Sequence, residues 1–372
     1  MYVSYDGASE PLGRSQVVAY LERLAADFLI TLISFEKIPP PPDLREHLRA
    51  AGIRWRPLRY HRRPAVASTA WDVAVGARAI GQELRRRPRS ILHTRSYVAT
   101  EMALRSPRAR NAPLLFDIRG FWIDERLEGG GLRPGLVHRY ARRRERRFFG
   151  RADSIVTLTD ASVDPIRRRT APRGVPIEVI PSCTDVKRFA AARPSPYGPR
   201  LVWLGSVGTV YRLDLARRLA DVSGLPLVVF TRQIAEARAQ VGGDATVEYV
   251  PPDDLPRVLH EGDIGLCLYR EGAGRVATAP TRFAEHLAAG MPVAVTPGIG
   301  DLERIVEEEG IGGVLRAEDD ASLRAAAERI VAMAAESEVR ARCREVAARR
   351  FDVDRGAARY AELYLRLTRR AA

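Results

Sequence analysis

The sequence alternates short apolar runs with longer amphipathic stretches along its whole length. This is the pattern of β-α-β units, which place parallel strands in one sheet. A first series of expected strands comprises Met1–Tyr5, Ile30–Ser34, Ile91–His93, Leu114–Ile118, Ser154–Leu158 and Ile177–Ile180. A second series comprises Leu201–Leu204, Leu225–Phe230, Thr246–Tyr249, Ile264–Leu268, Pro292–Val295 and Gly313–Leu315. The sequence therefore predicts an α/β fold with two doubly wound, Rossmann-like domains.

The length of 372 residues exceeds what one ordinary core needs and suits two domains. The stretch 190–200 is rich in Ala, Arg and Pro, which is typical of a linker. We expect a first domain over residues 1–187 and a second over 188–353. The final segment, 354–370, has apolar residues at helical spacing and is predicted to be an amphipathic helix.

Several classes of protein are excluded by what the sequence lacks. No run approaches the roughly 18–20 apolar residues that a membrane span needs. The N-terminus has no basic start and no long apolar stretch, so we expect no signal peptide and a cytoplasmic protein. The cysteines Cys183, Cys267 and Cys343 lie far apart without metal-ligand spacing, and we expect no bound metal.

The basic charge is concentrated in the first half of the chain. Residues 1–185 hold 33 Lys and Arg against 20 Asp and Glu, whereas the rest of the chain is nearly balanced. The segment His138–Arg151 alone holds seven arginines, with Phe148 and Phe149 beside them. A helix of this kind is able to lie on an anionic membrane with its aromatic side chains inserted, so peripheral association with the inner membrane face is one expectation. A solvated basic helix with a phenylalanine anchor in the core is the alternative.

Two glycine-containing turns follow expected first strands and suit a phosphate. Glycine lets the backbone approach a ligand closely, and a helix N-terminus offers free N–H groups. Gly205, Ser206 and Gly208 follow Leu201–Leu204, and a looser loop runs from Gly7 to Gly13. Neither turn is a complete dinucleotide or P-loop motif, so each is equally compatible with an ordinary tight turn.

A more specific pattern lies at Ala279–Val293, which reads APTRFAEHLAAGMPV. Pro280 and Thr281 open a helix, Gly290 ends it, and Pro292 opens a strand. Arg282 on the first turn would pair with a phosphate, and Glu285 one turn later would accept hydrogen bonds from sugar or ribose hydroxyls. A helix cap with a surface Arg and Glu is the alternative reading.

This segment resembles the donor-binding segment of retaining glycosyltransferases of family four. Four further stretches resemble that family in order and spacing, namely Tyr5–Gln16, Leu92–Ser96, Phe116–Gly120 and Val179–Asp185 with Phe189; the loop Thr296–Asp301 resembles the one that follows the donor segment. The resemblance covers about residues 1–368. It implies the GT-B fold, in which two Rossmann-like domains face a central cleft and a C-terminal helix, here 354–370, packs back on the first domain.

The resemblance also implies roles for the residues that match. The first domain would be the acceptor side, bordered by Asp117 and Arg119, and the second would bind a nucleotide-diphosphate sugar. Arg282 and Arg212 would neutralise the diphosphate, and Arg232 would border the base. Further donor contacts would come from Gly7, Gly13, Gly205, Ser206, Gly208, Thr281, Glu285, Gly298, Gly300 and Asp301. No metal and no other cofactor would be needed.

Three positions depart from the family pattern. Family members often carry a second acid eight residues before the one matched by Glu285, and here that position is Ala277. Ser206 stands where many members have Arg, and Arg119 stands where many have a strand-end histidine.

The predicted function is transfer of a sugar from a nucleotide-diphosphate sugar to an unidentified glycan, lipid-linked or small-molecule acceptor, with retention of configuration. A nucleotide-sugar 2-epimerase of the same fold is one alternative. A basic nucleic-acid- or membrane-binding protein without catalysis is another, although no known nucleic-acid module is recognisable and no nucleic-acid partner is expected. A chain that kept the fold and lost activity with the acid at position 277 is a third.

Overall fold

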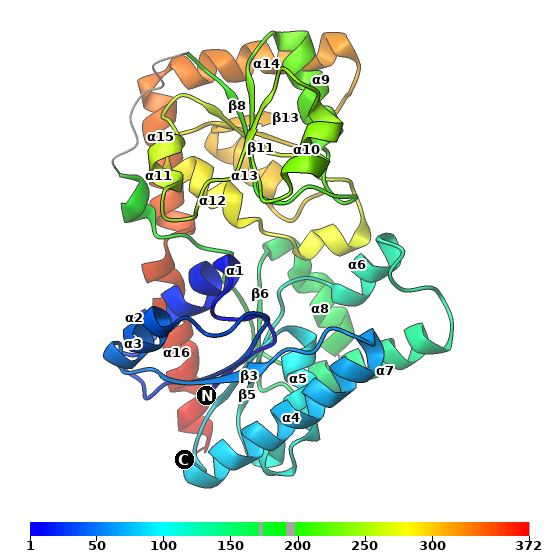
Figure 1. Ribbon diagram of the computed structural model, residues 1–372, viewed down its shortest axis with the longest axis vertical. Coiled ribbons are helices and arrows are strands. Elements are labelled where there is room, and N and C mark those ends of the chain that lie inside the picture. The colour runs from blue at the N-terminus through cyan, green and yellow to red at the C-terminus, as the bar shows by residue number, and fades with distance from the viewer. Residues whose placement is uncertain (171–173, 191–197, 372) are drawn as a thin grey trace. The chain divides into compact units, whose positions relative to one another are not determined.

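The computed structural model describes residues 1–170, 174–190 and 198–371 (Figure 1). Contacts divide the chain into two compact units, Met1–Pro181 with Val353–Ala372, and Ser182–Asp352. Each unit contains one parallel sheet in its described residues. The predicted fold class, α/β with two parallel sheets, is confirmed. The core of the expected linker, 191–197, lies outside the described residues.

The first unit is built on a seven-stranded sheet in its described part, with strand order β3-β2-β1-β4-β5-β6-β7. The strands are β1 (Tyr2–Ser4), β2 (Thr31–Glu36), β3 (Arg54–Arg59), β4 (Leu92–Arg95), β5 (Leu114–Asp117), β6 (Ser154–Thr157) and β7 (Ile177–Val179). The α-helices are α1 (Pro11–Gly13), α2 (Ala19–Leu24), α3 (Pro42–Ala50), α4 (Ala65–Arg86), α5 (Ser96–Arg105), α6 (Trp122–Glu128), α7 (Leu136–Arg151), α8 (Val163–Thr170) and α16 (Val353–Ala371). Shorter turns are η1 (Arg14–Val18, a π-helix), η2 (Pro107–Asn111) and η3 (Asp160–Ser162).

The second unit has a six-stranded sheet in the described residues, with order β10-β9-β8-β11-β12-β13. Its strands are β8 (Leu201–Leu204), β9 (Leu227–Phe230), β10 (Thr246–Glu248), β11 (Ile264–Cys267), β12 (Val293–Val295) and β13 (Gly312–Val314). Its helices are α9 (Leu213–Ser223), α10 (Ile234–Val241), α11 (Leu255–Val258), α12 (Thr281–Ala288), α13 (Leu302–Glu309), α14 (Asp320–Ala335) and α15 (Ser337–Arg350). Two 3-10 turns, η4 (Val186–Phe189) and η5 (Ala273–Ala277), complete the unit.

The expected strands all form, and one further strand is found. β3, with the sequence RWRPLR, lacks the apolar run of a buried strand because it lies at the edge of the sheet beside β2. An edge strand tolerates Pro57 and charged side chains that a central strand would exclude. The predicted loop from Gly7 to Gly13 needs correction, because Pro11–Gly13 form the short helix α1. Pro42 likewise begins helix α3. Proline is well suited to a first helical turn, where its missing N–H is not needed.

The last helix, α16, belongs to the first unit although it follows the whole second unit in sequence. It packs against α2, as Figure 1 shows in red and blue. Tyr360, Leu363, Tyr364 and Leu367 are buried, and Tyr360 meets Tyr20 of α2 edge-to-face at 5.6 Å between ring centroids. The amphipathic pattern of this segment therefore marks its contact with the first sheet and its helices.

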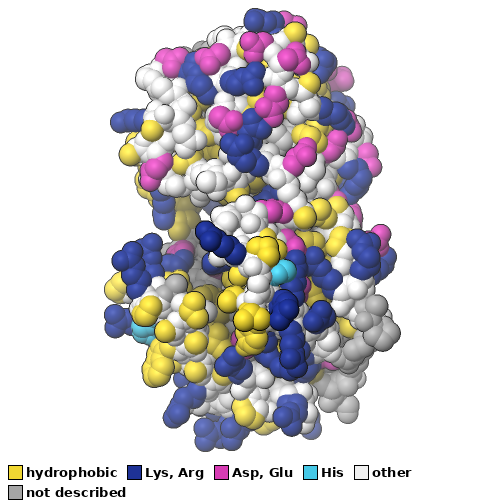
Figure 2. Space-filling view, turned by 90° about the vertical axis from the view of Figure 1, so that its right-hand side faces the viewer, with side chains coloured by type: hydrophobic (Ala, Val, Ile, Leu, Met, Phe, Trp, Pro, Cys, Tyr) yellow, Lys and Arg dark blue, Asp and Glu magenta, His cyan; other side chains and the backbone are white. Residues whose placement is uncertain are grey.

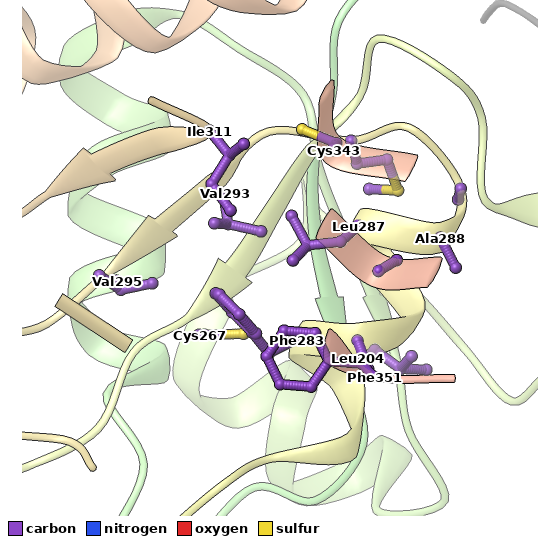
Figure 3. Packing of buried hydrophobic residues seen from close by; sticks show 14 of the residues in the cluster. Leu204, Cys267, Phe283, Leu287, Ala288, Val293, Val295, Ile311, Cys343 and Phe351 are labelled. Atoms are coloured by element: carbon purple, nitrogen blue, oxygen red, sulfur yellow. The ribbon is translucent and has the colours of Figure 1, made fainter. Parts of the chain in front are cut away.

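Helix α12 is fixed on the second sheet by its apolar face (Figure 3). Phe283 and Leu287 are buried in one cluster with Cys267 and Val293 from strands β11 and β12. The ring of Phe283 also meets that of Phe351 edge-to-face, with centroids 5.5 Å apart. Because Phe283 packs in this core, the helix cannot rotate, and the side chain of the neighbouring Arg282 leaves the helix in a fixed direction.

Candidate functional site

Both sheets have a topological switch point. This is the place between two neighbouring strands whose following connections run to opposite sides of the sheet. In the second sheet this point lies between β8 and β11, and in the first between β1 and β4. Ligands of open parallel sheets bind outside the carboxyl ends of the strands at such points. The side chains at these two edges are therefore the candidate site residues.

At the second switch point the turn after β8 contacts the start of α12. Gly205 has a φ of +106°, and its N–H donates to the Phe230 carbonyl oxygen at 2.9 Å. A Cβ atom at position 205 would lie 2.8 Å from Nη2 of Arg282. The structure therefore brings together two residues that the sequence predicted for the same anion, Gly205 and Arg282.

The Arg282 guanidinium is enclosed by aromatic rings. Its central carbon lies 5.2 Å from the ring centroid of Trp203, 5.0 Å from that of Tyr211 and 5.7 Å from that of Tyr269. Tyr211 and Tyr269 are themselves joined by an antiparallel bridge. We call Trp203, Tyr211 and Tyr269 the aromatic cage.

Arg282 is a buried cation that forms no ion pair with any described residue, although the charge of Glu285 acts on it. The residue is 8% exposed, and its Nη1 has no hydrogen-bond partner among the described residues. A buried charge without a partner is costly, whereas aromatic faces stabilise a cation without neutralising it. This arrangement leaves the guanidinium available for an anion that arrives from outside.

Glu285 lies on the same helix, one turn beyond Arg282. Burial raises the pKa of its carboxyl to about 7, although Arg282 and Arg188 act in the opposite direction. The adjacent His286 is buried against Gly265, and burial together with Arg282 lowers its pKa to about 3. Glu285 is thus an acid that changes its charge near neutral pH, beside a histidine that stays neutral.

Arg212 is placed differently from Arg282. Its guanidinium donates to Asp214 Oδ2 at 2.9 Å and to Glu318 Oε1 at 2.7 Å, and these carboxylates raise its pKa. An incoming diphosphate would compete with two acids that already bind this side chain. Arg232, at the end of β9, lies over the ring of Tyr249 at 5.3 Å and is exposed.

The loop after β12 is closed by its own hydrogen bonds. The Gly300 N–H donates to the Arg275 carbonyl at 3.0 Å, and the Gly298 N–H is 3.4 Å from Glu303 Oε2. Both glycines have positive φ, +74° at 298 and +48° at 300. Asp301 lies 3.6 Å from Arg304 at the start of α13.

The remaining predicted donor residues of this unit lie in the turns around Arg282. Thr281 is the first residue of α12. The N-cap residue of this helix is Pro280, whose side chain makes no capping hydrogen bond. Ser206 is exposed in the turn after β8, and Gly208, with a φ of +152°, has open space where a Cβ would lie. Position 277, where family members often carry an acid, is a buried alanine in η5.

In the first unit Asp117 is the centre of a buried ionic cluster at the carboxyl end of β5. Its carboxylate lies 3.5 Å from Arg119 Nη1, 3.4 Å from His93 Nε2 and 4.0 Å from Arg95 Nη1. Burial alone would raise the pKa of Asp117, but Arg119, His93 and Arg95 together hold it well below its usual range. The predicted pair Asp117 and Arg119 is therefore in contact and ionised.

Two further contacts extend this cluster across the first switch point. Arg95 Nε lies 3.3 Å from Asp6 Oδ2, so the ends of β4 and β1 are joined by an ion pair. His93 Nδ1 lies 2.6 Å from the Tyr364 hydroxyl of α16, and burial lowers the pKa of this histidine. In the described residues, no group of three or more His, Cys, Asp and Glu is placed to hold a metal ion.

The glycine loop of the first unit is occupied by a carboxylate of the chain itself. Glu36, at the end of β2, accepts the Ala8 N–H at 2.8 Å and the Ser9 N–H at 3.0 Å. Gly7 and Gly13 pack against each other so closely that a Cβ at 13 would lie 1.9 Å from the Gly7 oxygen. These glycines therefore serve close packing, and the Ala8 and Ser9 N–H groups of the loop are already bonded to Glu36.

The basic segment 138–151 forms most of α7, and its aromatic residues correct one expectation. Phe148 and Phe149 are buried in the core, so they are not free to enter a membrane. The exposed apolar residues of this helix are Leu136, Val137 and Tyr140. Figure 2 shows Lys and Arg side chains gathered with hydrophobic ones on the visible face of the first unit. Of the helices in the described residues, none is long and apolar enough to cross a membrane.

Sequence reasoning missed the aromatic cage and Glu36. The cage residues lie up to 66 positions apart in the sequence and meet only because β8 and β11 are neighbours. Glu36 left a weak signal, since an acid ends an otherwise apolar strand, TLISFE. Asp6, His93 and Arg95 lay within stretches that resembled the family but were not singled out.

Comparison with known proteins agrees with this architecture. Residues 14–183 match the family model described as "Glycosyl transferase 4-like domain". No curated protein sequence matches the chain significantly.

Solved structures of glycosyltransferases share the fold over nearly the whole chain. Sucrose-phosphate synthase from Thermosynechococcus elongatus has a TM-score of 0.75 at 16% identity, covering 99% of each chain. WaaG, a glycosyltransferase of lipopolysaccharide biosynthesis, has 0.68 at 14%, covering 98% of this chain and 99% of its own. HepE of Anabaena, in complex with UDP and glucose, has 0.66 at 13%, covering 97% and 98%. Such identities establish the GT-B fold alone, and the domain match covers less than half of the chain.

Proposed function

We propose that this protein is a glycosyltransferase, which takes its sugar from a nucleoside-diphosphate sugar bound at the second switch point. The observation that carries the proposal is the Arg282 guanidinium, buried beside Gly205 with an Nη1 that no described residue accepts from. When the bond between the sugar and the diphosphate oxygen breaks, the departing nucleoside diphosphate gains about one negative charge, and fixed cations at that place stabilise the transition state. The HepE structures with UDP and with UDP-glucose support this donor class.

Glu285 is proposed to hold the ribose of the donor. It lies one turn from Arg282, so a diphosphate at the guanidinium would place the adjoining ribose within reach of its carboxylate. Asp301 and the backbone of Gly298–Gly300 would contact the donor sugar or its phosphates, and the base would lie toward Arg232. Arg212 would contribute only if the diphosphate displaces Asp214 or Glu318, which bind it in this structure.

The acceptor is proposed to bind at the Asp117 cluster of the first unit. Asp117 and Arg119 lie at the carboxyl end of β5, and Asp6 and Arg95 extend the polar edge to β1 and β4. Carboxylate and guanidinium groups suit the hydroxyls of a sugar, a lipid-linked sugar or a small molecule. Retention of configuration is proposed on the motif resemblance alone, and it requires no protein nucleophile.

Donor binding tests the proposal directly. Wild-type protein and Arg282→Ala would be titrated calorimetrically with UDP, GDP, ADP and TDP, and the tightest nucleotide would then be used as its sugar. We expect the variant to lose at least tenfold in affinity with an unchanged circular dichroism spectrum, because a charge-assisted contact to phosphate is removed. Equal affinity of the two proteins would refute the role of Arg282, and no binding of any nucleotide to the wild type would refute the donor class.

A nucleotide-sugar 2-epimerase of the same fold is the competing enzyme. It would convert the sugar nucleotide without any acceptor, so product analysis of donor alone separates the two reactions. A transferase should show only slow hydrolysis under these conditions, and a 2-epimer would instead identify the competing activity.

We further propose that α7 brings the protein to an anionic membrane surface. Leu136, Val137 and Tyr140 are exposed at one end of the helix, and Arg139 and Arg143 lie among them. Exposed apolar residues beside arginines favour a surface with both acyl chains and negative headgroups. Co-sedimentation with phosphatidylcholine vesicles, with and without phosphatidylglycerol, tests this, and indifference to the lipid charge would remove the idea.

A further inference from the structure

A basic hollow lies in the first unit between α4 and the corner where α5 meets η2. It has a volume of about 510 Å³, and small residues of α4, Ala74, Ala77 and Gly81, form one wall. An adjoining hollow reaches Leu92 and Leu114, the first residues of β4 and β5. The hollow therefore lies toward the amino ends of the strands, away from Asp117 at the carboxyl end of β5.

Three arginines that line the hollow have no carboxylate partner among the described residues. Arg78 and Arg85 come from α4, and Arg108 comes from η2 on the opposite wall. Arg78 and Arg85 are seven residues apart, so they lie on one face of α4 at about 10.5 Å along its axis. All three arginines are exposed, and they present positive charge to the hollow from two elements.

The two glutamates nearest this hollow in sequence pair with other arginines. Glu83, on the other side of α4, binds Arg54, Arg56 and Arg86. Glu101 binds Arg105, a fourth arginine of the hollow, at 2.6 Å. Glu83 and Glu101 thus pair with other arginines and not with the three that line the hollow.

Ser106 provides a second, independent feature of the same hollow. Its side chain is 2% exposed, and its hydroxyl has no hydrogen-bond partner in the described part of the chain. The hydroxyl lies against α4, because a Cβ at Gly81 would be 3.2 Å from Ser106 Oγ. A buried hydroxyl without a partner costs free energy that a ligand oxygen would recover.

We propose that this hollow binds the phosphate group of a ligand outside the catalytic edge. Guanidinium groups present paired N–H donors that match phosphate oxygens, and Ser106 adds a hydroxyl on the same wall. The same chemistry is offered by a free phosphate ester and by the headgroup of an anionic lipid. The inference does not depend on the identity of the sugar donor.

The test uses the full chain and two probes. Glycerol 3-phosphate is titrated by calorimetry, and vesicles of phosphatidylcholine with or without phosphatidic acid are used in co-sedimentation. The hollow variants are Arg78→Ala combined with Arg108→Ala, and Ala74→Glu, which places a carboxylate at an exposed position of the wall. The matched control is Arg59→Ala combined with Arg168→Ala, which removes the same charge from exposed positions outside the hollow.

We expect both hollow variants to lose at least tenfold in affinity for one or both probes, with the control within twofold of wild type. Loss with glycerol 3-phosphate identifies a soluble phosphate site, whereas loss confined to phosphatidic acid vesicles identifies a lipid headgroup site. Equal weakening of the control and the hollow variants would mean general charge attraction and overturn the proposal. Thermal unfolding of each variant is measured in parallel, and Ala74→Glu keeps the test decisive if the double variant unfolds early.

Discussion

The side chain of Arg282 occupies the space that a Cβ atom at Gly205 would need, since Nη2 would be only 2.8 Å from that atom. Gly205→Ala should therefore displace the guanidinium, and at a φ of +106° it should also strain the turn by about 1–3 kcal/mol. We expect nucleotide affinity to fall about tenfold in calorimetry. Gly243→Ala is the control, because a Cβ there meets nothing within 4 Å. Unchanged nucleotide affinity in Gly205→Ala would contradict the assignment of this turn.

The aromatic cage gives a prediction that distinguishes the contribution of the Tyr211 ring from that of its hydroxyl. Tyr211→Phe keeps the ring over Arg282 and should bind nucleotide within about twofold of wild type. Tyr211→Leu removes the ring face, worth about 0.5–2 kcal/mol, and should lose about two- to thirtyfold in affinity. If the Phe variant binds as weakly as the Leu variant, the hydroxyl is the important group and the cage interpretation is wrong.

Glu285 predicts a pH dependence of donor binding. With a pKa of about 7, the carboxyl is ionised at pH 8 and about nine-tenths protonated at pH 6, so affinity for the nucleoside diphosphate should fall about five- to tenfold over that range. Glu285→Gln should bind weakly and lose most of this dependence. Calorimetry in matched buffers measures both, and an equally steep profile in the variant would assign the titration to another group.

The same raised pKa has a defined sign for stability. Because the folded protein holds this proton more tightly than the unfolded chain, the unfolding free energy falls as pH rises from about 4.5 to 7. Glu285→Gln should therefore stabilise the protein more at pH 8 than at pH 5. Thermal unfolding at the two values checks this, and a larger gain at pH 5 would reverse the conclusion.

Asp117 predicts the opposite sign in the first unit. Its pKa is held low by Arg119, His93 and Arg95, so its contribution is present above about pH 4 and is lost as pH falls through the folded value. Asp117→Asn should cost about 3 kcal/mol at pH 7, because it leaves buried arginines without their carboxylate. Tyr364→Phe removes only the hydroxyl near His93 and should cost about 1 kcal/mol. Thermal melts would contradict this if Asp117→Asn were no less stable than Tyr364→Phe.

The sequence predicted the central strands because each is a short apolar run, but it did not predict β3, whose arginines and Pro57 suit only an edge. Arg282 and Glu285 were predictable because both belong to one helix with clear start and stop residues. The surroundings of Arg282 were not, since Trp203 and Tyr269 meet it through the order of strands in the sheet. Arg212 shows the same limit, because its partner Glu318 lies 106 residues away.

The loops that follow the first strand of each sheet differ in how their polar groups are bonded. After β1 the backbone N–H groups of Ala8 and Ser9 are bonded to Glu36, a counter-ion that is part of the polypeptide and cannot leave. After β8 the Arg282 Nη1 has no hydrogen-bond partner among the described residues. The loop of the first unit therefore holds its own negative group, whereas the proposed donor site of the second unit leaves a guanidinium N–H to an anion that is free to exchange.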